Sequence, residues 1–165
     1  MKNNLFNKKS LSFMFFDFGT SPIPTIHTTF IFSVYFVNKI AVENGSFVWG
    51  LLIGFTGFLT AIIAPFLGSY TDKVGNRKFY LFYITLLGTI STALLFFAKP
   101  NIDFLYYAIL FSVISIISME LIFVLYNSLL SVSTSKFHRG KISGFAWFSG
   151  YIGGILSLLI CLFIF

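Results

Sequence analysis

Five long apolar runs constrain the fold of this chain more than any other feature of its sequence. Each has at least 20 residues, and they cover residues 11–37, 47–70, 79–98, 104–130 and 142–165. A helix of about 20 residues crosses the ~30 Å hydrocarbon core of a bilayer. Strand-type alternation is missing from these runs, and a helix satisfies its own backbone hydrogen bonds in lipid. We therefore predict an all-α membrane protein with five transmembrane helices at these positions.

The composition excludes an ordinary soluble domain. Hydrophobic residues make up 57% of the 165 residues and charged residues 10%, whereas soluble domains are about 45–50% apolar and about 25% charged. The net charge is +6, but the charges lie in short clusters between the apolar runs. This distribution argues against a nucleic-acid partner, and we expect the lipid bilayer to be the main surrounding of the chain.

The positive charges predict the orientation of the helices. The side of the membrane with Lys39 and Lys99 has two of the eleven Lys and Arg residues, and the other side has nine. Short cytoplasmic segments are enriched in Lys and Arg, so we predict a cytoplasmic N-terminus. The expected location is the inner (plasma) membrane of a bacterium. The nine Lys and Arg residues on the predicted cytoplasmic side are Lys2, Lys8, Lys9, Lys73, Arg77, Lys78, Lys136, Arg139 and Lys141.

The loop between the second and third runs carries a recognisable motif, GSYTDKVGNRK, at residues 68–78. It resembles the cytoplasmic loop signature of the major facilitator superfamily, G-x-x-x-D-(R/K)-x-G-(R/K)-(R/K), with Asn76 at a position that is usually basic. The resemblance implies a conformational latch, and an ordinary basic loop is the alternative. Glycine permits a tight turn, and a carboxylate can pair with arginine or cap a helix. The latch residues are Gly68, Asp72, Lys73, Gly75, Arg77 and Lys78.

Three further segments narrow the resemblance. They are FDFGTSP at residues 16–22, YNSLL at 126–130 after Glu120, and GFAW followed by GYIGG between residues 144 and 154. They resemble the vacuole-effluxer branch of the superfamily, which is related to the autophagy-linked amino-acid exporter of fungi. The resemblance implies secondary active transport of small organic solutes, such as amino acids, by alternating access. It covers the first five of about twelve helices, an incomplete N-terminal half of the fold.

Two carboxylates lie inside the apolar runs. A charge in lipid costs about 2.5–3.5 kcal/mol by insertion scales, so both should face protein or a water-filled cavity. Ser21 shares the face of Asp17, with Thr20 and His27 beside it, while Asn127 shares the face of Glu120. We hypothesise that these side chains bind a cationic group or exchange a proton, the alternative being structural ties. The candidates are Asp17, Thr20, Ser21, His27, Glu120 and Asn127.

Pairs of glycines spaced by four residues predict close helix packing. They are Gly50 with Gly54 in the second run and Gly150 with Gly154 in the fifth. By the family resemblance these two helices would also meet the other half of a transporter. Pro22 and Pro24 predict a kink in the first helix beside Asp17.

Motifs of enzymes and metal sites are absent from the sequence. It contains no H-E-x-x-H, no Walker loop and a single cysteine. We expect no catalysis, no cofactor and no metal. Because the superfamily alternates two six-helix halves, a five-helix chain predicts a truncated or split transporter that pairs with a separately encoded remainder. The alternatives are a remnant that does not transport and a small membrane scaffold or regulator.

Overall fold

The computed structural model describes residues 6–164, and within them the backbone is helical without a strand, as the sequence predicts. Four α-helices are long. They are α4 (Gly45–Val74), α5 (Arg77–Leu94), α6 (Leu105–Ser133) and α7 (Arg139–Ile164). Short 3₁₀ turns adjoin them: η3 (Leu95–Phe97), η4 (Ile102–Phe104) and η5 (Lys136–His138). The segment before α4 comprises α1 (Lys8–Thr20), α2 (Pro22–Pro24), η1 (Thr25–Phe30), α3 (Phe32–Tyr35) and η2 (Phe36–Ile40).

Four helical stretches among the described residues are long and apolar enough to cross a membrane. They are Gly45–Val74, Arg77–Phe97, Ile102–Ser131 and Lys136–Ile164. These stretches contain nearly all of the second to fifth predicted helices. Large apolar side chains on them are exposed, for example Phe47, Phe58 and Phe66 on α4. Exposed phenylalanines along a 30-residue helix fit a hydrocarbon solvent, so the chain is a multi-pass membrane protein.

The first predicted helix, at residues 11–37, differs from a continuous α-helix. It begins at Lys8, ends at Ile40 and changes its hydrogen-bonding pattern after Thr20. Two prolines follow, and each lacks the N–H that an α-helix needs in its interior. The chain then continues in the π-helical turns η1 and η2, separated by α3. Such π-helical turns are rare and often occur at functional sites.

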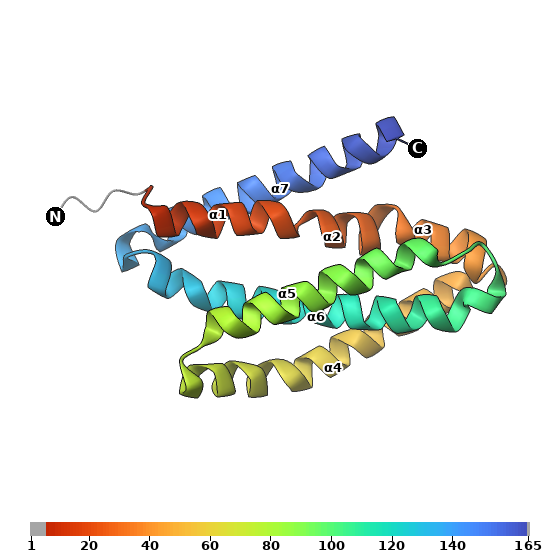
Figure 1. The fold of residues 1–165 in the computed structure, drawn as a ribbon, viewed down its shortest axis with the longest axis horizontal. Helices are drawn as coiled ribbons and strands as arrows, with labels where there is room; N and C mark the ends of the chain where they lie inside the picture. Colours follow the sequence, from red (N-terminus) through yellow and green to blue (C-terminus); the bar gives the residue numbers. More distant parts are fainter. Residues whose placement is uncertain (1–5, 165) are drawn as a thin grey trace. The chain divides into compact units, whose positions relative to one another are not determined.

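The chain divides into two compact units, with α6 contributing to both. Unit 1 consists of Met1–Ile26 and Tyr126–Phe165, and unit 2 consists of His27–Leu125. In unit 1, α1 packs along α7, as Figure 1 shows for the red and blue helices. The Ser149 hydroxyl donates to the carbonyl of Met14 at 2.9 Å, which fixes the register of this pair.

Close approach of α7 to the first segment depends on the absence of side chains. A Cβ atom at Gly153 would overlap the carbonyl oxygen of Phe18, and one at Gly154 would lie 2.9 Å from Thr25 Oγ1. Small residues allow helix backbones to approach in membranes, where packing rather than the hydrophobic effect drives association. Gly153 and Gly154 therefore set the distance between the backbone of α7 and the first segment.

Unit 2 has its own small core. Buried Phe36, Ile40, Ala41, Ala98 and Ala108 pack together. Two tyrosine hydroxyls donate hydrogen bonds to backbone carbonyls near this core. The hydroxyl of Tyr35 donates to Ala98 O at 2.7 Å, and that of Tyr107 donates to Leu94 O at 2.8 Å. These bonds satisfy carbonyls at the end of α5 and η3, where the helical ladder leaves them without partners.

Candidate functional site

A carboxylate and a hydroxyl lie side by side in unit 1. Asp17 is half-buried on α1, and Ser21 follows one helical turn later. Both lie directly over Gly150 of α7. A Cβ atom at Gly150 would be 2.6 Å from Asp17 Oδ2 and 2.6 Å from Ser21 Oγ. The missing side chain of Gly150 therefore leaves the space that these two polar groups occupy.

No side chain that the structure describes neutralises the charge of Asp17. Among the described residues its side chain forms no ion pair and no hydrogen bond to another side chain. A membrane-embedded carboxylate without a cationic partner is costly, and such residues mark binding sites for ions, protons or polar solutes. The arrangement can therefore accept a proton or the cationic group of a solute.

Aromatic and hydroxyl groups surround this site in unit 1. Tyr126 stacks on Phe13 with a centroid distance of 4.0 Å, and its hydroxyl donates to Phe13 O at 3.1 Å. The hydroxyl of Thr20 donates to Phe16 O at 3.0 Å, one turn back on its own helix. Thr20 is thus satisfied locally, while Tyr126 forms a rigid aromatic surface next to α1.

A second polar site lies in unit 2, around His27. The imidazole is 1% exposed and sits on the π-helical turn η1. Its Nε2 is 3.1 Å from Ser112 Oγ, and its Nδ1 is 3.2 Å from Ser115 Oγ. Ser115 Oγ is in turn 2.6 Å from Thr92 Oγ1 on α5. The histidine therefore joins η1 to α6 and, through a serine, to α5.

Sequence reasoning found His27 but missed its two hydroxyl partners, Ser112 and Ser115. Isolated serines in an apolar run look neutral, because a helical serine can hydrogen-bond its own preceding turn. A usable signal was present in the spacing. Ser112, Ser115 and Ser118 recur every three residues, on nearly one face of α6, and all three are buried. A buried polar face in a membrane helix predicts a polar partner across from it.

The other candidates on α6 lie on an open face. Glu120 and Asn127 are exposed among the described residues, as is Ser131. Glu120 takes no part in the hydrogen-bond chain of His27. Asp17 belongs to unit 1 and Glu120 to unit 2, and the role of either carboxylate in binding a cationic group or a proton stays a hypothesis.

The loop that resembles the superfamily signature forms a tight turn between α4 and α5. Gly75 caps α4 with φ 72°, and its N–H donates to Thr71 O at 3.0 Å. This left-handed conformation favours glycine. Arg77 Nε donates to Asp72 Oδ1 at 2.9 Å, so a salt bridge spans the turn. Lys73 and Lys78 are exposed, and no other part of the described chain lies within 4 Å of a Cβ atom placed at Gly68.

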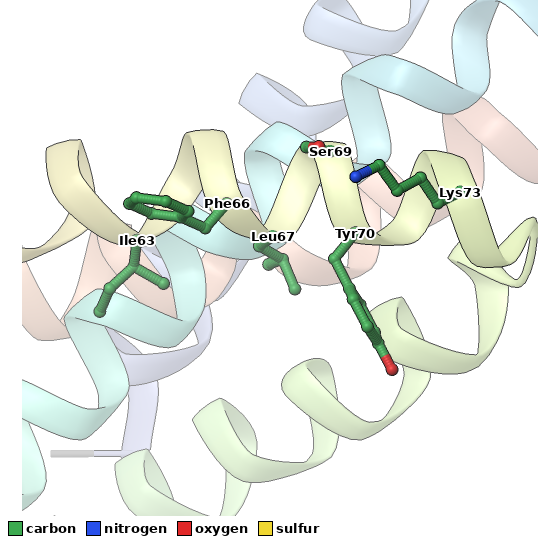
Figure 2. Close-up of a pocket in the computed structure, with 6 residues that line it drawn as sticks. All are labelled: Ile63, Phe66, Leu67, Ser69, Tyr70 and Lys73. Atoms are coloured by element: carbon green, nitrogen blue, oxygen red, sulfur yellow. The ribbon is translucent and has the colours of Figure 1, made fainter.

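A hollow of about 520 Å³ lies along the second half of α4, close to this loop. Figure 2 shows its lining side chains, which all come from one helix. The lining is apolar except for the ends of Ser69, Tyr70 and Lys73. The candidate solute residues do not contribute to it, so the hollow does not coincide with either polar site. Its lining residues are Ile63, Phe66, Leu67, Ser69, Tyr70 and Lys73.

The two predicted glycine pairs lie in different surroundings. Gly150 and Gly154 are buried against the segment that contains α1. Gly50 and Gly54 are exposed, and no other part of the described chain lies within 4 Å of a Cβ atom at either position. The close packing expected at Gly50 and Gly54 is therefore not seen in the part of the chain that the structure describes, because no helix of that part covers this face of α4. Within residues 6–164, no group of three or more His, Cys, Asp and Glu side chains is placed to hold a metal ion.

Comparison with known proteins identifies a family and two relatives of this chain. The family model described as Major Facilitator Superfamily matches residues 5–158. The chain is 27% identical over 161 residues to an uncharacterized MFS-type transporter of Bacillus subtilis (strain 168), YxiO, covering 94% of this chain and 37% of that protein. It is 28% identical over 153 residues to an uncharacterized protein of Aquifex aeolicus (strain VF5), covering 92% and 37%. No solved structure matches significantly.

Proposed function

The chain belongs to the major facilitator superfamily, and we propose that it forms the first part of a secondary transporter for small organic solutes. The match extends over most of the chain, and one relative is named an MFS-type transporter. The chain spans 37% of the length of both relatives. Transport is therefore proposed for this segment together with the remaining helices of the fold, supplied by the same or a separately encoded polypeptide.

The observation that carries the proposal is the Asp17 carboxylate over Gly150. It is half-buried in an apolar helix, lies next to the Ser21 hydroxyl and lacks an ion-pair partner among the described residues. Its desolvation cost, on the order of 2.5–3.5 kcal/mol by insertion scales, is offset when it binds a proton or an ammonium group. We assign it the cationic group of the solute, or the coupling proton.

Amino acids are the proposed solute class. They carry the ammonium group that Asp17 would bind, and the sequence resembles the vacuole-effluxer branch in the segments around Asp17 and Glu120. Glu120 is the second membrane-embedded carboxylate, and its exposed position on α6 leaves it available to the transport path. The salt bridge between Asp72 and Arg77 would hold the turn in one conformation and open in the other.

Carbodiimide labelling tests the proposed site directly. Dicyclohexylcarbodiimide enters the lipid phase and modifies protonated carboxyl groups there. We expect peptide mass spectrometry of the reconstituted chain to find label on Asp17. The Asp17→Asn variant should lack it, whereas the control Asp103→Asn, which changes an exposed carboxylate before α6, should retain it.

The effect of solutes on the labelling rate distinguishes a carboxylate that binds solute from one that only reacts with the carbodiimide. Amino acids and simple amines should slow the labelling of Asp17, while matched amides and neutral sugars should not. An Asp17 that is not labelled, or that is labelled at the same rate with every amino acid and amine, would contradict the proposal.

One observation favours a second candidate, a membrane scaffold that does not transport. Gly50, Gly54 and Gly57 leave an open small-residue face on α4. In lipid such faces support close helix association. The scaffold would be favoured over the transporter by two results together. The chain would self-associate and lose this association in a Gly54→Leu variant, and amino acids and amines would not slow the labelling of Asp17.

A further inference from the structure

The polar chain around His27 can be followed atom by atom. It runs from Ser112 on α6 through both ring nitrogens of His27 to Ser115, and then to Thr92 on α5. It ends where Thr92 Oγ1 donates to the carbonyl oxygen of Gly88 at 2.8 Å. Every link joins residues of unit 2.

The end of this chain determines the direction of every hydrogen bond in it. A carbonyl oxygen can only accept, so the single hydroxyl hydrogen of Thr92 is used on Gly88. Thr92 Oγ1 must then accept the hydrogen of Ser115, at 2.6 Å. Ser115 has no second hydrogen, so it must accept from His27 Nδ1, at 3.2 Å. Nδ1 is therefore the nitrogen that carries hydrogen.

The same counting of hydrogens determines the protonation state of the other ring nitrogen, Nε2. A neutral imidazole has one N–H and one acceptor nitrogen. With hydrogen on Nδ1, Nε2 accepts from the hydroxyl of Ser112, at 3.1 Å. Neutral histidine in water favours the opposite form, with hydrogen on Nε2. In proteins the partner of one ring nitrogen decides the state of the other.

We infer that unit 2 contains a proton-binding site in which His27 is held as the Nδ1–H tautomer and takes up a proton only at Nε2. The proton comes from a hydronium ion of the solvent, which is left as water, and adds to the Nε2 lone pair. The Ser112 hydroxyl then rotates from donating to accepting, and its hydrogen turns to a carbonyl of the preceding turn of α6, as helical serines commonly do. The bonds through Ser115 and Thr92 keep their direction.

The described side chains that contact the His27 ring are uncharged. Apart from the hydroxyls of Ser112 and Ser115, the ring contacts the aromatic rings of Phe32 and Trp49, at centroid distances of 5.3 and 6.0 Å. Among the described residues no carboxylate and no cationic side chain contacts it. Among the described residues, both ring nitrogens therefore have hydroxyl partners, and no contacting charge selects the tautomer.

Nitrogen-15 NMR of the full chain, labelled in histidine and reconstituted in lipid, measures the tautomer directly. The chain has two histidines, and a His138→Gln variant assigns the signals. We expect Nδ1 of His27 to resonate as a protonated nitrogen and Nε2 as an unprotonated one. On acidification the Nε2 signal should become that of a protonated nitrogen, while Nδ1 changes little. Hydrogen on Nε2 of the neutral ring would overturn the inference.

Two threonines of α5 provide a matched pair of variants. Thr92→Val removes the acceptor for Ser115, so Ser115 becomes able to donate to Nδ1 and the preference for the Nδ1–H form should be lost. Thr85→Val removes a hydroxyl that donates only to Leu81 O, at 2.7 Å, and should leave the tautomer unchanged. An unchanged tautomer in Thr92→Val would also overturn the inference. This readout needs no solute and no transport, so it stands or fails separately from the role proposed for Asp17.

Discussion

Replacing Gly153 by alanine should weaken the packing of α7 against α1. A Cβ atom at this position would overlap the carbonyl oxygen of Phe18 and lie 3.1 Å from its carbonyl carbon. The overlapped atoms belong to the backbone of α1, which cannot rotate out of the way as the end of a side chain can. The two helices must therefore move apart, and unit 1 should lose stability.

The size of the effect follows from two opposing terms. Overpacking of a well-packed interface costs about 1–3 kcal/mol. Alanine is better than glycine in a helix by about 1 kcal/mol, which offsets part of this cost. The matched control is Gly144→Ala on the same helix, where no other part of the described chain lies within 4 Å of the added atom. The control keeps only the gain, so the two variants should differ by about 1–3 kcal/mol.

Equilibrium unfolding of the full chain in mixed micelles, with increasing sodium dodecyl sulfate, provides the comparison. Circular dichroism and tryptophan fluorescence both report the transition, and Trp147 on α7 serves as a probe in unit 1. We expect Gly153→Ala to unfold at a lower detergent fraction than the natural chain, and Gly144→Ala at an equal or higher one. Equal stability of the two variants would refute the packing of α7 on α1.

Two smaller predictions concern single contacts. Tyr126→Phe keeps the ring stack but removes the hydrogen bond to Phe13 O. It should lower the free energy of unfolding by about 1 kcal/mol in the same assay. The control Tyr151→Phe, at a side chain that is 65% exposed, should leave the free energy of unfolding unchanged. At Gly75, with φ 72°, alanine should lower the unfolding midpoint and asparagine should largely preserve it, because asparagine tolerates the left-handed region. Equal midpoints for the two Gly75 variants would contradict the turn geometry.

The membrane helices were predictable because lipid leaves few alternatives. An apolar run of 20 or more residues must satisfy its own backbone, and clusters of Lys and Arg mark where it leaves the hydrocarbon. The turn after α4 could also be foreseen, because Gly75 lies between a long apolar run and the basic pair Arg77 and Lys78. A glycine at such a place commonly ends a helix, and Gly75 ends α4 in the left-handed conformation.

The interior of the first segment could not be foreseen in the same way. Pro22 and Pro24 predict a disturbance, but they do not specify the π-helical turn η1 that follows them. The partners of His27 come from 85 and 88 residues further along the chain. Sequence periodicity shows that one face of a helix is polar, but it does not show which other helix packs against that face. The contact of Asp17 with Gly150 was hidden for the same reason.

We predict that the interrupted first segment crosses the membrane, so that a cytoplasmic N-terminus places the loop around Gly75 in the cytoplasm. Single cysteines at Glu43, before α4, and at Asn76, after it, test this in a Cys161→Ser background. A maleimide that cannot cross membranes should label residue 43 in intact bacterial cells, and residue 76 only after the cells are permeabilised. Labelling of residue 76 in intact cells, or protection of residue 43, would contradict the account.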